Sequence, residues 1–250
     1  MANWNDPQTT RTPWGEPAES AGAVGAPRAG TVDQGLRSYM LSIYNYMTSG
    51  VLLTGIVALV TAQMGLAYAF ATGPLMWVVA LAPLAIVFAM SFGAGKFATG
   101  TLKAMFWAFA VLMGLSLSTI FLVYTGGSIA ATFFATAAAF AGLSLIGYTT
   151  KKDLSALGTF LIMGVVGLIV ASLINMFVQS PGLMWAISFL GVLIFAGLTA
   201  YDTQRLKVSY YTMRGTEWAG KMVVLGALQL YLDFINMFLF LLRFMGNQRS

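Results

Sequence analysis

The stretch LYLDFINMF, residues 230–238, places a carboxylate, Asp233, inside an apolar run that extends over residues 219–244. That run exceeds the roughly 20 residues that an α-helix needs to cross a bilayer. An ionised Asp at the centre of such a helix costs about 2.5–3.5 kcal/mol on insertion scales. Acidic residues at that depth are usually paired, protonated or exposed to water, and Asp233 is therefore a candidate functional residue.

The composition of the whole chain is that of an integral membrane protein. Of its 250 residues, 58% are hydrophobic and only 8% are charged, whereas a soluble domain carries about 25% charged residues. The chain has no Cys and no His. Their absence excludes disulfides, thiolate nucleophiles, the usual zinc sites and every catalytic arrangement that uses a His base. Proton chemistry near neutral pH is left to carboxylates, Tyr or Lys.

Seven apolar runs follow residue 36, and each is long enough to span a bilayer. Their approximate bounds are 39–69, 75–95, 104–125, 128–149, 155–178, 183–208 and 219–244. The sequence therefore predicts an all-α membrane protein with seven transmembrane helices, in a domain that covers residues 37–250. The first run is over-long, which predicts a tilt or an interfacial turn at its start.

Residues 1–36 are predicted to be a disordered polar cytoplasmic tail. They contain four of the seven prolines and four of the eight acidic residues of the chain. A segment of this composition cannot bury enough apolar surface to order itself. It also lacks the basic and apolar regions that make up a signal peptide.

The number of basic residues alternates between zero and at least two from one connection between spans to the next. The six connections, with the adjoining ends of the spans, carry 0, 2, 0, 2, 0 and 4 Lys or Arg. By the positive-inside rule, this alternation predicts a cytoplasmic N-terminus. Arg243 and Arg249 then run against the rule, unless the last segment crosses only half of the membrane, which is the alternative. The net charge of +5 forms no basic stripe with interleaved aromatics, so we expect no nucleic-acid partner.

The last span carries a polar stripe. At 100° per residue, Gln229, Asp233, Asn236 and Arg243 share an arc of about 80° and extend along about 21 Å of the helix. The remaining surface of that helix is Leu, Phe, Met and Val. Because a stripe of this kind is costly in lipid, we expect it to face protein or water and the last helix to be enclosed by the others.

A second carboxylate, Asp202, lies near the end of the preceding, antiparallel span. The depths of Asp202 and Asp233 are expected to differ by about 9 Å, which modest tilt could remove. Two carboxylates in contact tend to share a proton, and such a pair is a pH sensor made without His. Fully ionised, the pair would offer the hard oxygen ligands that suit Ca²⁺. Two simpler interpretations remain: Asp233 as a structural hydrogen-bonding residue, and Asp202 as a helix-end residue that meets Arg205 or Lys207 in solvent.

Three motifs resemble those of the Bax inhibitor-1 (transmembrane Bax-inhibitor-motif) family, and the likeness runs from about residue 36 to residue 246. The motifs are GYTTKKDLS at 147–155, GLTAYDTQ at 197–204 and LYLDFIN at 230–236. The resemblance implies a bacterial inner-membrane protein in which the other six helices surround the last one. It also implies a pH-sensitive calcium leak channel without enzymatic activity or a cofactor, in which Ca²⁺ is the transported or bound ion. The aspartate pair that governs the leak in the family matches Asp202 and Asp233.

The resemblance also implies roles for two further residues. Family members can carry a basic residue at the cytoplasmic end of the second span that latches onto the aspartate of the sixth, and the nearest candidate is Lys96. A Lys provides a point charge rather than a bidentate partner. Asp153 belongs to the first motif, and we interpret it as a residue that caps the start of the fifth span.

Two other functions remain as alternatives. The first is a regulatory partner of a membrane-bound protease, a role attributed to some bacterial relatives, for which the polar tail would suit a cytoplasmic contact. The second is an intramembrane aspartyl protease, since those enzymes also place two Asp on adjacent spans, one of them in a Tyr-Asp pair such as Tyr201-Asp202. Their second motif, Gly-x-Gly-Asp, is not matched by residues 230–233, no Pro-Ala-Leu follows, and seven spans are too few. The oligomeric state stays open.

Overall fold

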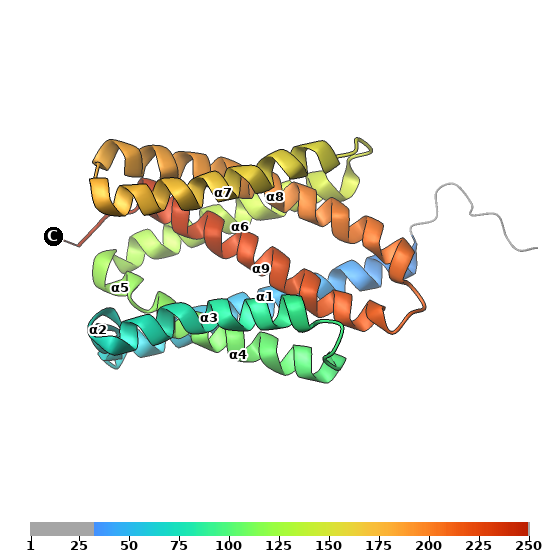
Figure 1. Ribbon diagram of the computed structural model, residues 1–250, viewed down its shortest axis with the longest axis horizontal. Helices are drawn as coiled ribbons and strands as arrows, with labels where there is room; N and C mark the ends of the chain where they lie inside the picture. Colours follow the sequence, from blue (N-terminus) through green and yellow to red (C-terminus); the bar gives the residue numbers. More distant parts are fainter. Residues whose placement is uncertain (1–32, 250) are drawn as a thin grey trace, which may run out of the picture. The chain divides into compact units, whose positions relative to one another are not determined.

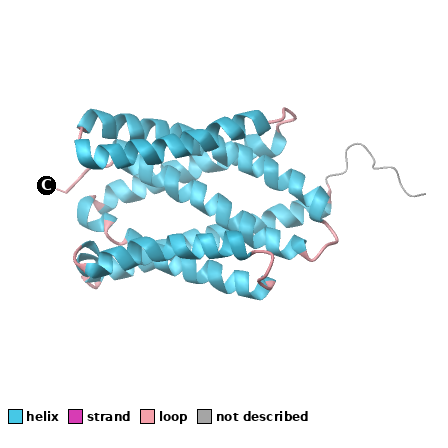
Figure 2. Cartoon of the chain, in the orientation of Figure 1, coloured by secondary structure: helices cyan, strands magenta, loops and turns pink. Residues whose placement is uncertain are grey.

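The computed structural model describes residues 33–249, which form a bundle of helices joined by short loops (Figures 1 and 2). Within this described part of the chain, seven spans are long and apolar enough to cross a membrane, with α4 and α5 together counted as one. This confirms the predicted fold class. The helices are α1 (Gln34–Gln63), α2 (Leu66–Ala71), α3 (Pro74–Gly93), α4 (Thr99–Leu117), α5 (Ile120–Val123), α6 (Gly126–Thr149), α7 (Ser155–Val178), α8 (Pro181–Met213) and α9 (Trp218–Met245).

The predicted boundary between tail and membrane domain differs slightly from the structure. Helix α1 begins at Gln34, so the last three residues of the predicted tail belong to the first span. Apart from Asp33, the rest of the predicted tail lies outside the described residues.

Two of the predicted spans are divided by local features. The first run ends as a helix at Gln63, and a left-handed turn at Gly65, with φ of 74°, separates it from α2. The turn is thus at the far end of the run, not at its start. The third run breaks between α4 and α5, where the hydroxyls of Ser118 and Thr119 donate to carbonyls three residues earlier, at 2.6 and 3.0 Å. Such bonds compete with the helical pattern, and here they coincide with the break.

The last helix is the most buried of the seven spans. In its most apolar window 61% of the residues are buried, compared with 17–39% in the other spans. It packs against α8, α1, α6 and α4, and Figure 1 shows it running obliquely between one group formed by α6, α7 and α8 and another formed by α1, α3 and α4. The main contacts of α3 and α7 are with α4 and α8. Enclosure of α9 by all six other spans therefore stays a prediction.

The C-terminal end of α9 is tied to the loop that follows α5. The backbone N–H of Thr125 donates to the carbonyl of Asn247 at 3.1 Å, and that of Arg249 donates to the carbonyl of Val123 at 2.8 Å. Because α9 is continuous over 28 residues and ends beside this loop, it extends along the whole bundle. The alternative of a half-crossing last segment is wrong for this structure.

A close approach of α6 and α8 fixes the position of the helix that carries Asp202. A methyl group placed on Gly147 would overlap the backbone carbonyl of Ala200, and one placed on Gly158 of α7 would overlap the ring of Tyr201. Glycine at both positions lets the neighbouring helix pack directly against the backbone, as small residues do in membrane bundles. Helix α8 is therefore held between α6 and α7 on one side and α9 on the other.

Candidate functional site

The structure brings the two membrane aspartates together. Asp202 lies 11 residues before Met213, where α8 ends, and Asp233 lies 15 residues after Trp218, where α9 begins. Their depths along the antiparallel pair therefore differ by four residues, or about 6 Å, which is less than the sequence predicts. A side-chain hydrogen bond joins the two carboxyl groups. Each residue is only 5% exposed.

The hydrogen bonds of the pair leave its oxygens unequally satisfied. A carboxylate has no donor of its own, so a bond between two carboxyl groups needs a proton on one of them. Asp202 also forms a side-chain hydrogen bond with Gln229, one turn before Asp233 on α9. Within the described residues, the second oxygen of Asp233, Oδ2, has no hydrogen-bond partner. This arrangement leaves one buried oxygen of the pair free to accept a hydrogen bond.

Arg205 is the cation whose charge acts on Asp202. It lies one turn further along α8 and is exposed. The other basic residue considered for this role, Lys207, donates its Nζ to the carbonyl of Tyr148 at 2.6 Å. The interpretation of Asp202 as a residue that meets these bases in solvent is wrong, because its side chain is buried between helices.

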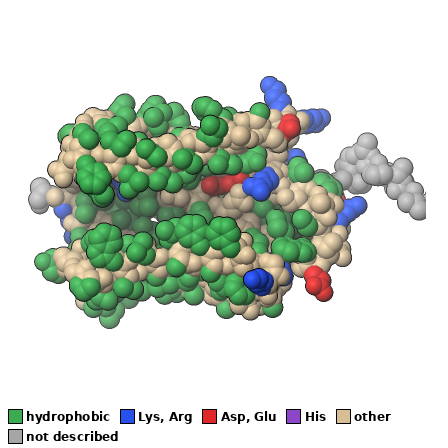
Figure 3. Space-filling model, viewed as in Figure 1, with side chains coloured by type: hydrophobic (Ala, Val, Ile, Leu, Met, Phe, Trp, Pro, Cys, Tyr) green, Lys and Arg blue, Asp and Glu red, His purple; other side chains and the backbone are tan. Residues whose placement is uncertain are grey.

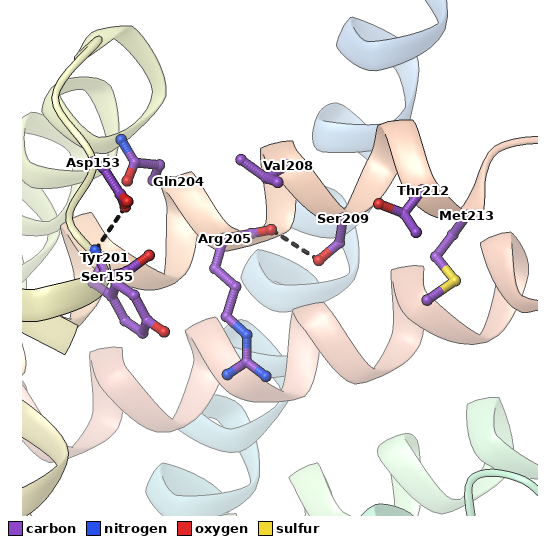
Figure 4. A pocket seen from close by; sticks show the side chains of 9 residues that line it. All are labelled: Asp153, Ser155, Tyr201, Gln204, Arg205, Val208, Ser209, Thr212 and Met213. Carbon is purple, nitrogen blue, oxygen red and sulfur yellow. Dashed lines mark hydrogen bonds between the residues drawn. The ribbon is translucent and has the colours of Figure 1, made fainter. Parts of the chain in front are cut away.

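A cavity of about 400 Å³ opens beside this end of α8 (Figure 4). Its lining includes Asp153, Tyr201 and Arg205, but neither aspartate of the buried pair. In Figure 4, the guanidinium group of Arg205 points away from Asp153 and from the loop that precedes α7. Arg205 therefore both lines an open cavity and influences the buried pair.

Asp153 lies one residue before Leu154, the N-cap residue of α7, and its side chain binds the first residue of the helix rather than capping it from the N-cap position. Its Oδ1 accepts a hydrogen bond from the backbone N–H of Ser155 at 2.9 Å. Hydrogen bonds from the side chain and the backbone of Ser155 hold the pKa of this exposed carboxyl below its usual value. Gln204 of α8 anchors the same loop, since its Oε1 accepts from the N–H of Leu154 and its Nε2 donates to the carbonyl of Lys152.

Lys96, the proposed latch, is not part of the site in this structure. It lies in the exposed turn that follows α3, and no contact between its side chain and Asp202 is present in the described part of the chain. The same turn is instead held by α9, where Lys221 donates its Nζ to the carbonyl of Ala94 at 3.1 Å. A latch between Lys96 and Asp202 remains a prediction for another state of the protein.

The four residues of the polar stripe of α9 differ in how far they are exposed. Asp233 is buried, Gln229 and Asn236 are half-buried, and Arg243 is exposed. Asn236 donates its Nδ2 to the carbonyl of Leu232 at 2.8 Å. Figure 3 shows a hollow between the two helix groups, with acidic and basic atoms inside it, on a face that is otherwise largely apolar. Whether the whole stripe faces away from lipid remains a prediction.

Sequence reasoning missed a second buried polar contact of α9. The hydroxyl of Tyr231 is 2.7 Å from Oγ1 of Thr54 on α1, and Thr54 in turn donates to the carbonyl of Ala110 on α4 at 2.8 Å. Tyr231 must therefore be the donor in the first bond. Only the polar tip of a Tyr inside an apolar run could have indicated this contact, since a buried Tyr hydroxyl needs a partner.

Comparisons with known proteins agree with this architecture. The family model described as "Inhibitor of apoptosis-promoting Bax1" matches residues 36–250. A protein of Caulobacter vibrioides is 48% identical over 231 residues, 88% of this chain and 92% of the relative. The protein RP147 of Rickettsia prowazekii is 45% identical, over 88% of this chain and 94% of its own length. The inner membrane protein YbhL of Escherichia coli K12 is 44% identical, over 89% and 98%. The chain belongs to the Bax inhibitor-1 family of membrane proteins.

Proposed function

We propose that the protein is a pH-sensitive calcium leak channel in which Asp202 and Asp233 form the sensor and gate. The observation that supports this most strongly is the hydrogen bond between the two buried carboxyl groups. In a membrane protein without His, such a pair is the group best suited to change charge with pH inside the bundle.

The proposed cycle follows from the charge of the pair. With one shared proton, the hydrogen bond holds α8 against α9. When that proton leaves, two negative charges are in contact, and their repulsion favours separation of the helices or binding of a cation. The pair and the amide oxygen of Gln229 can supply up to five oxygen ligands, and water or backbone would complete the six to eight that Ca²⁺ takes. Among the described residues no group of three acidic side chains surrounds a metal site, which suits an ion that passes through better than one that stays.

Calcium flux into liposomes between pH 5 and pH 8 tests this function. Asp202→Asn and Asp233→Asn keep the shape of the side chains and remove their titration, so each should flatten the pH dependence of the flux. Because the proton belongs to the pair, the double variant should add little to either single one. Glu217→Gln is the matched control, because it removes an exposed carboxylate at the start of α9. A wild-type pH profile in both Asp variants would contradict the proposal.

The same assay separates the two candidate bases. Arg205 already acts on Asp202, whereas Lys96 is exposed and apart from it. If Arg205 stabilises the ionised pair, Arg205→Gln should shift the pH profile and Lys96→Gln should not. The opposite result would support the latch that the family resemblance implies.

We also propose that the protein lies in the cell inner membrane, as the name of YbhL states for that relative, with its N-terminus in the cytoplasm. The alternation of basic residues supports this orientation. The chain has no Cys, so single cysteines give labelling without background. A cysteine at the exposed Gly127 should react with an impermeant reagent added outside, and one at the exposed Lys151 should not. Reaction at position 151 alone would reverse the orientation.

A further inference from the structure

A second cavity lies at the end of the bundle where α9 finishes. It has a volume of about 540 Å³ and is formed by residues of α2, α5 and α9. Apolar side chains such as Ile120, Leu239 and Leu242 make up most of its lining, together with the rings of Tyr68 and Tyr124. The backbone pairing of residues 123–125 with residues 247–249 fixes the wall that α5 and the C-terminal segment share.

One charged side chain, that of Arg243, lines this cavity. Arg243 is exposed, and its guanidinium carbon is 5.8 Å from the centre of the Phe240 ring. No ion pair joins it to any acidic side chain within residues 33–249. The nearest carboxylate along α9, that of Asp233, is ten residues away, or about 15 Å. The described acidic residues near helix ends all belong to the opposite end of the bundle: Asp33, Asp153 and Glu217.

The depth of the cavity in the membrane indicates which group could supply a negative charge to Arg243. Arg243 is two residues from the end of α9, and Tyr68 and Tyr124 stand at the same end of the bundle, as aromatic residues do at the boundary between lipid tails and headgroups. Lipid phosphates lie at this boundary. A guanidinium group pairs strongly with phosphate oxygens, and Tyr hydroxyls can donate further hydrogen bonds to them.

We propose that this cavity binds an anionic phospholipid, with the phosphate on Arg243 and an acyl chain against Leu239 and Leu242. The apolar lining suits the acyl chain, and a cation with no acidic partner within residues 33–249 favours an anionic over a zwitterionic headgroup. The site also accounts for an Arg at the end of the last span, where the positive-inside rule disfavours one in the proposed orientation. This inference does not depend on calcium flux.

Lipid-dependent thermal stability of the full-length protein in a non-ionic detergent tests the site. Dioleoylphosphatidylglycerol and dioleoylphosphatidylcholine are titrated separately, and the rise of the unfolding midpoint gives an apparent affinity for each. Wild-type protein should respond to phosphatidylglycerol at lower concentration than to phosphatidylcholine. Arg243→Gln should weaken the apparent affinity for phosphatidylglycerol about fivefold, because one basic residue near the membrane surface contributes about that much to binding of anionic lipid. The apparent affinity for phosphatidylcholine should stay unchanged. Arg249→Gln is the matched control and should behave as wild type.

Several outcomes would overturn the inference. Equal responses to the two lipids, or equal losses in Arg243→Gln and Arg249→Gln, would show that no specific site exists. A response to inorganic phosphate as large as that to phosphatidylglycerol would assign the site to a free anion. If Arg243→Gln does not fold, Leu239→Trp decides, because it fills the cavity and keeps the charge: a weaker response to phosphatidylglycerol supports the site, and an unchanged response contradicts it.

Discussion

Helix α7 is more apolar than helix α9 but is less buried in the bundle. The most apolar window of α7 has a mean hydropathy of 2.5 and is 17% buried, whereas that of α9 has a mean hydropathy of 1.8 and is 61% buried. In water the more apolar helix would be the one inside. In a bilayer the lipid is as apolar as a Leu side chain, so the helix that carries Gln229, Asp233 and Asn236 gains most from contact with protein. The less apolar of these two helices is therefore the one that is more deeply packed.

Truncation of one Leu in each helix should give the largest contrast. Leu230 of α9 is fully buried, and Leu173 of α7 is 54% exposed. Leu230→Ala should destabilise the protein by about 2–5 kcal/mol, because it leaves a cavity in a packed region. Leu173→Ala should change stability far less, since lipid replaces the lost contacts. Reversible unfolding in mixed micelles measures both, and equal losses would remove the contrast between the two helices.

Insertion of a methyl group tests the packing around α8. Gly147→Ala places that group against the carbonyl of Ala200 and should cost about 1–3 kcal/mol, as over-packing does. Gly142 is on the same helix, is exposed, and has nothing within 4 Å of an added Cβ. Gly142→Ala should therefore be neutral or slightly stabilising in the same unfolding measurement. Loss of stability in both variants would point to helix α6 itself and not to its contact with α8.

Removal of one hydroxyl tests the polar contact that ties α9 to α1. Tyr231→Phe breaks the 2.7 Å bond to Thr54 and should cost about 0.6–1.7 kcal/mol, from the average to the largest value measured for hydrogen bonds between membrane helices. Thr54→Val should cost more, because it also removes the bond to the carbonyl of Ala110, and the double variant should show that the two effects are not additive. Tyr211→Phe, at a position 52% exposed, serves as the control and should leave stability unchanged.

The smallest effect is expected at the exposed start of α7. Hydrogen bonds from Ser155 lower the pKa of Asp153, so the ionised form is favoured in the folded state. The contribution of Asp153 to stability is therefore present above the unfolded value of about 3.9 and is lost as pH falls through the folded pKa. Wild type and Asp153→Ala should differ in thermal stability at pH 7 and converge in strong acid. A difference that is the same at both pH values would contradict this role of the carboxylate.

Much of this architecture could be predicted from the sequence because long apolar runs have few alternatives in a membrane. The fifth predicted span, 155–178, coincides with α7, and most of the other ends fall within a few residues of the structure. The breaks after Gln63 and Leu117 were not predicted. They depend on a left-handed Gly65 and on the hydroxyls of Ser118 and Thr119, and neither interrupts the apolar pattern.

The candidate site could be predicted only in part. The pairing of Asp202 with Asp233 followed from two carboxylates at similar depths on antiparallel helices. The partner role of Gln229 and the influence of Arg205 depend on the rotation of α8 against α9, which the sequence does not specify. The contact between Tyr231 and Thr54 joins positions 177 residues apart, and no local pattern links them.

The proposed sensor requires that Asp202 and Asp233 share one proton inside the bundle. Infrared spectroscopy of protein labelled with ¹³C in the Asp carboxyl groups tests it directly, because the C=O stretch of a protonated carboxyl is separate from the carboxylate bands. We expect one buried protonated band that is lost as pH rises and that is removed or shifted by either Asp202→Asn or Asp233→Asn, whereas Glu217→Gln leaves it intact. A band that persists unchanged in one of the two Asp variants would show that the proton belongs to a single residue and would contradict the shared-proton sensor.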